Sequence, residues 1–143
     1  MIVTFEVEGV AAPQGSKTRT RYGFRESSKR VKPWRDRVKQ AASIHADQIA
    51  LLGPLDPPYK VEMWFYIQKP RTTRASHPVA PTVGDLEKLC RSVNDALTDS
   101  GLIQDDRFIT ELAASKAWAG RNETPGAIIR ITELTNHTNG SAT

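Results

Sequence analysis

Four acidic residues occupy two places in the chain where carboxylates could act together. Asp85 and Glu87 lie two positions apart in the stretch GDLEKLCR, and Asp105 and Asp106 are adjacent further along. In an extended segment, residues two apart point to the same side, so an extended approach to the following helix would hold Asp85 and Glu87 together. Carboxylate oxygens suit Mg²⁺, which takes one or two carboxylates, several waters and substrate phosphate. The pattern therefore predicts a magnesium site, provided that Asp106 folds back to meet the first two acids.

The same acids also have a purely structural explanation. Acidic residues at a helix N-terminus stabilise that helix by about 0.3–1 kcal/mol through its dipole, and an Asp-Asp pair is common in turns. The spacing alone leaves both interpretations open. A softer metal is not favoured, because the chain has 1 cysteine and no Cys and His cluster. That cysteine, Cys90, is expected to be a small buried hydrophobic residue.

Positive charge is concentrated near the start of the chain. The sequence carries 20 basic and 16 acidic residues, for a net charge of +4. Ten of the basic residues lie in residues 17–39, where only Glu26 and Asp36 oppose them, which gives that stretch a net charge of +8. A concentrated positive field points to a polyanionic partner such as nucleic acid. A solvated charged face explains the same charges equally well.

Hydropathy patterns predict the elements that must position these residues. Alternation of apolar and polar residues indicates strands, and apolar residues at helical spacing indicate helices. The strands are expected over residues 2–8, 59–68, 108–118 and 126–133, the helices over 33–52 and 86–100, and long loops over 9–32 and 69–84. The order β-α-β-α-β-β predicts an α/β (α+β) fold, in which a small mixed sheet of about four strands packs against two helices.

Length and composition bound the class of protein. A chain of 143 residues suits a single domain, which we expect to span residues 1–134, with a disordered polar tail over residues 135–143. No run of 18 or more apolar residues is present, and the start MIVTFEVEGV lacks the basic region of a secretory signal. We therefore expect a protein of the reducing cytoplasm, with no membrane partner and no organic cofactor.

The stretch GDLEKLCRSVNDALTDSGLIQDD resembles the core signature of the RusA family of Holliday junction resolvases. The family pattern is Asp-x-Asp-Asn-Leu-x-x-Lys, then Asp-Ala-Leu, and then Asp-Asp. The resemblance extends over residues 1–133, and the segments PQGSK at 13–17 and KPWR at 32–35 are similar to the phage branch of the family. It implies a RusA-like fold and a homodimer that acts on four-way or other branched DNA.

The resemblance also implies roles for particular residues. Asp85, Glu87 and Asp106 take the places of the catalytic acids that hold Mg²⁺, or Mn²⁺ in its place, with Asp105 beside them as a further ligand. Arg91 replaces a lysine of the family, and its permanently charged guanidinium suits a phosphate clamp rather than a proton donor. The residues expected to bind DNA are Lys17, Arg19, Arg21, Arg25, Lys29, Arg30, Lys88 and Lys116.

Three functions remain open at this point. The first is a Mg²⁺-dependent endonuclease that resolves Holliday junctions in recombination, repair or phage DNA processing. The second is a nuclease for other branched DNA, such as forks or flaps. The third is a branched-DNA-binding protein without catalysis, in which Glu87, one methylene longer than the usual Asp, has degraded the metal site.

Overall fold

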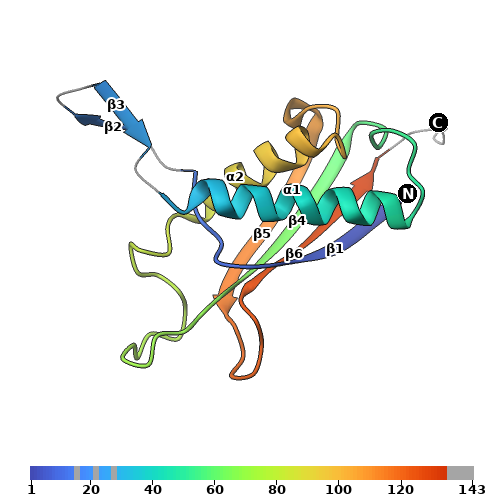
Figure 1. Ribbon diagram of the computed structural model, residues 1–143. Helices are drawn as coiled ribbons and strands as arrows, with labels where there is room; N and C mark the ends of the chain where they lie inside the picture. The colour runs from blue at the N-terminus through green and yellow to red at the C-terminus, as the bar shows by residue number, and fades with distance from the viewer. Residues whose placement is uncertain (15–16, 21–22, 27–28, 135–143) are drawn as a thin grey trace.

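The fold is built on a four-stranded mixed sheet (Figure 1). The computed structural model describes residues 1–14, 17–20, 23–26 and 29–134. Strands β1 and β4 each pair antiparallel with β6, whereas β4 and β5 run parallel and are joined by a crossover that contains a helix. The strand order is β1-β6-β4-β5, with β1 at Ile2–Glu8, β6 at Gly126–Glu133, β4 at Tyr59–Ile67 and β5 at Ile109–Trp118.

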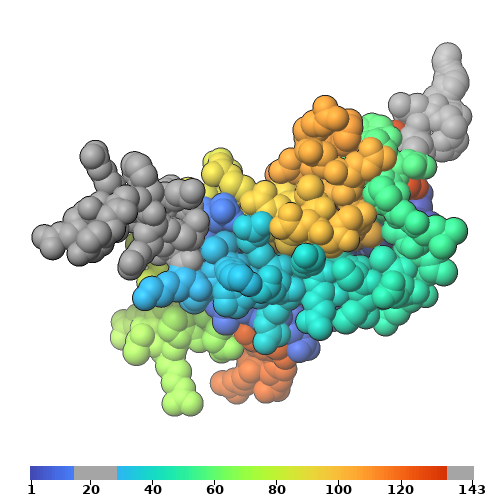
Figure 2. Space-filling view, turned by 45° about the horizontal axis from the view of Figure 1, so that its top comes forward, coloured from blue at the N-terminus to red at the C-terminus, as the bar shows by residue number. Residues whose placement is uncertain are grey.

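Two helices cover one face of this sheet. They are α1 at Val31–Gln48 and α2 at Leu86–Ser100, and Figure 2 shows α1, in light blue to teal, beside α2, in yellow to gold. Both helices and the sheet contribute apolar side chains to one core. Its fully buried members include Val3, Val61, Met63, Phe65, Ile129 and Ile131 from the strands, and Trp34, Val38, Leu89, Val93 and Leu97 from the helices.

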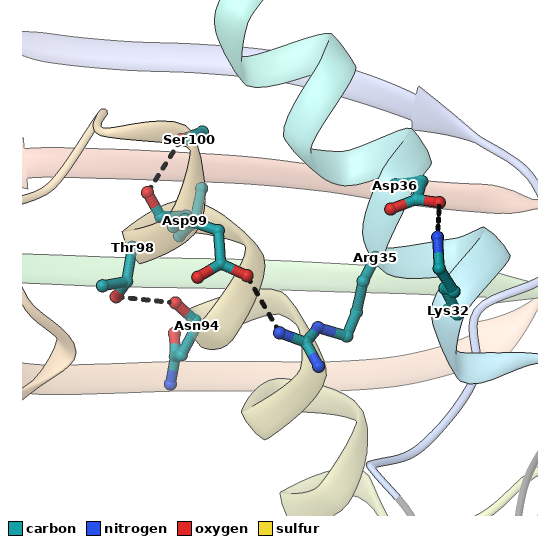
Figure 3. Close-up of polar contacts among 8 residues, drawn as sticks. Lys32, Arg35, Asp36, Asn94, Thr98, Asp99 and Ser100 are labelled. Atoms are coloured by element: carbon teal, nitrogen blue, oxygen red, sulfur yellow. Dashed lines mark hydrogen bonds and ion pairs between the residues drawn. The ribbon is translucent and has the colours of Figure 1, made fainter.

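A surface ion pair joins the two helices. The guanidinium of Arg35 on α1 donates to the carboxylate of Asp99 on α2 at 2.9 Å (Figure 3). Within α1, Lys32 bonds to Asp36 one turn away, also at 2.9 Å. Exposed pairs of this kind contribute about 0–1 kcal/mol each. The apolar core therefore provides most of the attachment of α2, and the Arg35–Asp99 pair adds a small stabilisation where α1 begins and α2 ends.

The predicted fold class and element order are confirmed, and three details of the prediction are wrong. The loop expected over residues 9–32 contains an antiparallel hairpin, β2 at Lys17–Thr20 and β3 at Gly23–Glu26. The helix expected over 33–52 is α1 at Val31–Gln48. It stops early because Ala50 has a positive φ of 54° and because Leu52 is 101% exposed, so it has no surface to pack against.

The third detail concerns the strand expected over residues 108–118. It begins at Ile109 and is preceded by a short 3-10 helix, η1, at Asp106–Phe108. The predicted tail at 135–143 lies outside the described residues. In the part of the chain that the structure describes, no helix is both long and apolar enough to cross a membrane.

Candidate active site

Asp85 stands at the start of α2 with its carboxylate unused by the helix. It is the N-cap residue, with extended backbone angles of φ −71° and ψ 140°, and its side chain makes no capping hydrogen bond. Aspartate is among the residues that cap helices best, yet this one does not cap. Its carboxylate is instead exposed beside the positive end of the helix dipole. That carboxylate is available to an external ligand.

Glu87 lies in the first turn of α2 rather than in the extended segment before it. The expectation that Asp85 and Glu87 share one side of an extended segment is therefore wrong, because the helix begins between them. Instead, Glu87 accepts a hydrogen bond from Arg91 at 3.2 Å, one helical turn later. Their side chains are 81% and 53% exposed, so the pair contributes only about 0.3–0.5 kcal/mol. Either side chain can exchange this partner for a metal ion or a phosphate at small cost.

Asp105 and Asp106 are adjacent carboxyl groups at η1 whose pKa values shift in opposite directions. A hydrogen bond from the backbone N–H of Arg107, at 2.9 Å, lowers the pKa of Asp105. Burial raises the pKa of Asp106, and so do the neighbouring Asp105 carboxyl and the negative charge of Asp95. The first proton that this pair binds therefore resides on Asp106. A cation bound beside Asp106 would favour its ionised form instead.

Asp95, on α2, is close enough to Asp106 for the two negative charges to interact. Burial raises its pKa and Asp99 adds to the rise, whereas the charges of Arg35 and Arg91 oppose it. Its negative charge in turn contributes to the raised pKa of Asp106. The sequence marked Asp95 only as part of the Asp-Ala-Leu motif, and its proximity to Asp106 depends on how η1 packs against the helix.

The acids thus fall into two groups along α2. Asp85 and Glu87 lie at its start. Asp95 lies eight residues after Glu87, which is about 12 Å along the helix axis, and Asp106 is close enough to Asp95 for their charges to interact. Figure 1 shows the opposite ends of α2, one near the loop that follows β4 and the other near the segment that leads into β5. Among the described residues, no three His, Cys, Asp or Glu side chains lie together closely enough to hold a metal ion. Within one chain, Asp85, Glu87 and Asp106 therefore do not come together as a single metal site.

The segment that leads to the basic hairpin is fixed to α2. The backbone N–H of Gln14 donates to the carbonyl of Lys88 at 2.9 Å. The buried hydroxyl of Ser92 donates to the carbonyl of Ala12 at 2.8 Å and also lies 2.9 Å from that of Leu89. Figure 1 shows β2 and β3 extending away from the sheet beyond this attachment. The sequence did not reveal these contacts, because all three acceptors are backbone carbonyls, which every residue type carries.

The residues expected to bind DNA occupy different environments. Lys29 and Arg30 are exposed just before α1, and Arg30 donates to the carbonyl of Thr82 at 3.0 Å. Lys88 is half-buried on α2, and the ammonium of Lys116 donates to the carbonyl of Gly84 at 2.9 Å. The remaining residues lie where side chains are not described: Lys17 and Arg19 in β2, Arg25 in β3, and Arg21, which is outside the described residues.

Cys90 is buried on α2, as its apolar neighbours predict. Burial raises the pKa of its thiol to about 11, with a smaller contribution from the charge of Glu87. At pH 8 the thiolate fraction then falls about 100-fold below that of an unperturbed thiol. We expect iodoacetamide to label the native protein at least about 100-fold more slowly than the protein in denaturant, as measured by mass spectrometry. Equal labelling rates would show that Cys90 is accessible.

Comparison with known families identifies the class of protein. Residues 7–132 match the family described as endodeoxyribonuclease RusA. This match covers most of the 143 residues, and the chain belongs to the RusA endodeoxyribonuclease family. It is accordingly an endodeoxyribonuclease of the Holliday junction resolvase class, whose members act on branched DNA and generally depend on a divalent metal ion. No curated protein matches the chain at a significant level.

Proposed function

We propose that this chain is a Mg²⁺-dependent resolvase of four-way DNA junctions in which Asp85, Glu87 and Asp106 are the metal ligands. Mn²⁺ is the expected substitute, and Asp105 supports Asp106. The observation that carries the proposal is the carboxylate of Asp85, which stands exposed at the N-terminus of α2 without capping it. With Glu87 one turn into the helix, it offers the hard oxygen donors that suit Mg²⁺.

The residues of the chain have separate roles in this proposal. When bound, the metal ion supplies Lewis-acid activation of water and neutralises charge at the leaving 3′ oxygen. Arg91 moves from Glu87 to the phosphate and stabilises the negative charge that develops there. Asp95 lies within reach of the charge of Arg91, and Glu87 holds the Arg91 side chain when no phosphate is bound.

We also propose that the working enzyme is a homodimer. A four-way junction has two-fold symmetry and needs paired cuts, which suits two equivalent active sites. The separation of the acids along α2 supports the same conclusion: Asp106 of one copy can complete a ligand set with Asp85 and Glu87 of a second copy. Each site then needs both chains.

The proposed function is tested by incubating a labelled four-way junction with the protein, with and without Mg²⁺. We expect symmetric nicks at the crossover only when Mg²⁺ is present. Junction binding without nicking in Mg²⁺ or Mn²⁺ would favour a DNA-binding protein with a degraded metal site. Competition with fork, flap and linear duplex substrates identifies the preferred branched DNA, and stronger cleavage of forks or flaps would overturn the choice of four-way junctions.

The basic segment leads to a prediction about salt. If about five phosphates are neutralised by residues such as Lys17, Arg19 and Arg30, log Kd should change with log salt with a slope of about 4–5. Replacing Lys17 and Arg19 together by Gln should reduce this slope by about 1.8, as measured by gel shift or fluorescence anisotropy. The control is Lys60→Gln, on β4 outside the basic segment, which should leave the slope unchanged. A salt response that the double variant does not alter would remove the hairpin from the interface.

A further inference from the structure

The side chain of Lys116 extends from β5, the edge strand of the sheet, to the residue just before Asp85 at the start of α2. In the parallel pairing of β4 and β5 it is the register partner of Phe65, which is fully buried, so both side chains lie on the face that the helices cover. The ammonium of Lys116 donates to the carbonyl of Gly84 at 2.9 Å, although the two residues are 32 positions apart. This hydrogen bond ties β5 directly to the residue that precedes Asp85.

Gly84 is held from a second side by Pro13. Its φ of +91° is one that residues with a side chain rarely adopt. A Cβ added there would lie 2.5 Å from Cγ of the Pro13 ring. Pro13 itself is fixed, because its neighbours Ala12 and Gln14 are hydrogen-bonded to α2. The peptide between Gly84 and Asp85 is therefore restrained by the close Pro13 ring and by the hydrogen bond from the Lys116 ammonium.

The direction of this peptide sets the direction of the Asp85 carboxylate. Asp85 makes no capping hydrogen bond that would fix its side chain, so the backbone, through the direction of its Cα–Cβ bond, sets the region that the carboxylate can reach. A carboxylate that takes part in catalysis must be held close to its working geometry, and a displacement of about 1 Å can reduce the rate about 100-fold. A contact that fixes the Gly84 carbonyl therefore acts on the position of Asp85.

We propose that Lys116 is a positioning residue of the active site, which acts through the carbonyl of Gly84 to hold Asp85 in its working orientation. This assignment rests on the proposed function and changes the role first expected for Lys116, a contact with DNA. Holding the carbonyl requires a hydrogen-bond donor at the end of a long side chain. Arginine meets this requirement, whereas methionine keeps the aliphatic stem and loses the donor.

The test compares Lys116→Met, Lys116→Arg and the control Lys60→Met on β4. Under single-turnover conditions with saturating enzyme, Lys116→Met should cleave the junction about 100-fold more slowly than the wild type. Its junction affinity and the salt slope of binding should be unchanged. The concentration of Mg²⁺ needed for half-maximal cleavage should rise, because a misplaced Asp85 binds the metal less well. Lys116→Arg should recover most of the rate, and Lys60→Met should match the wild type.

Other outcomes are distinguishable. If the wild type cleaves and Lys116→Met cleaves at the same rate, the positioning role is wrong while the proposed function stands. A normal cleavage rate with a salt slope reduced by about 0.9 would make Lys116 a phosphate contact. A lowered melting temperature and no recovery in Lys116→Arg would make its role purely structural. If the wild type itself does not cleave with either metal, the proposed function fails independently of Lys116.

Discussion

Replacing Asp85 by Asn should abolish cleavage of a four-way junction and leave binding of the junction intact. Asparagine keeps the size and the oxygen but removes the negative charge that holds a divalent cation. Metal assistance is worth several kcal/mol at the transition state, so the rate constant should fall at least about 10³-fold. The rate is measured with a labelled junction at saturating enzyme and Mg²⁺, and the affinity is measured in parallel by gel shift.

The substitution should leave folding intact, because the Asp85 side chain makes no capping hydrogen bond that the variant would lose. A matched control is Asp47→Asn near the end of α1, where an exposed carboxylate lies far along the chain from the acids of the site. It should cleave at the wild-type rate. Cleavage by Asp85→Asn at the wild-type rate would remove Asp85 from the active site, and loss of both binding and the folded state would point to a structural role for Asp85.

The general fold could be predicted because it depends on burial. Val3, Val61 and Leu97, for example, stand at spacings that match a strand or a helix, and each is buried in the core. The hairpin at β2 and β3 gave no such signal, because KTRT and GFRE offer almost no apolar alternation. The end of α1 was also missed, because Leu52 continues the helical spacing without a surface to bury against.

The candidate site was only partly predictable for a different reason. Residue types and spacing marked Asp85 and Asp106, and the family match spans the stretch that contains them. The distance between the two acids depends on how η1 and β5 pack around α2, which no local pattern encodes. The contact of Lys116 with Gly84 likewise joins segments 32 residues apart. Long-range hydrogen bonds to backbone carbonyls leave no trace in residue type at the acceptor.

Mixing two inactive variants should restore cleavage if the acids of one site come from two chains. Asp85→Asn and Asp106→Asn should each be inactive as homodimers. A mixed dimer, however, has one site that contains both substitutions and one site that contains neither. After subunit exchange, about half of the dimers are mixed and each has one intact site, so total nicking should reach about one quarter of the wild-type rate.

The products of the mixture carry a second signature. A dimer with one intact site nicks one strand per binding event, so the mixture should accumulate singly nicked junctions where the wild type makes paired cuts. If Asp85 and Asp106 instead served the same site within one chain, each chain of a mixed dimer would lack one ligand, and mixing would restore nothing. A control mixture of Asp85→Asn with Glu87→Gln should remain inactive under either arrangement, because the shared site places both of these residues on the same chain.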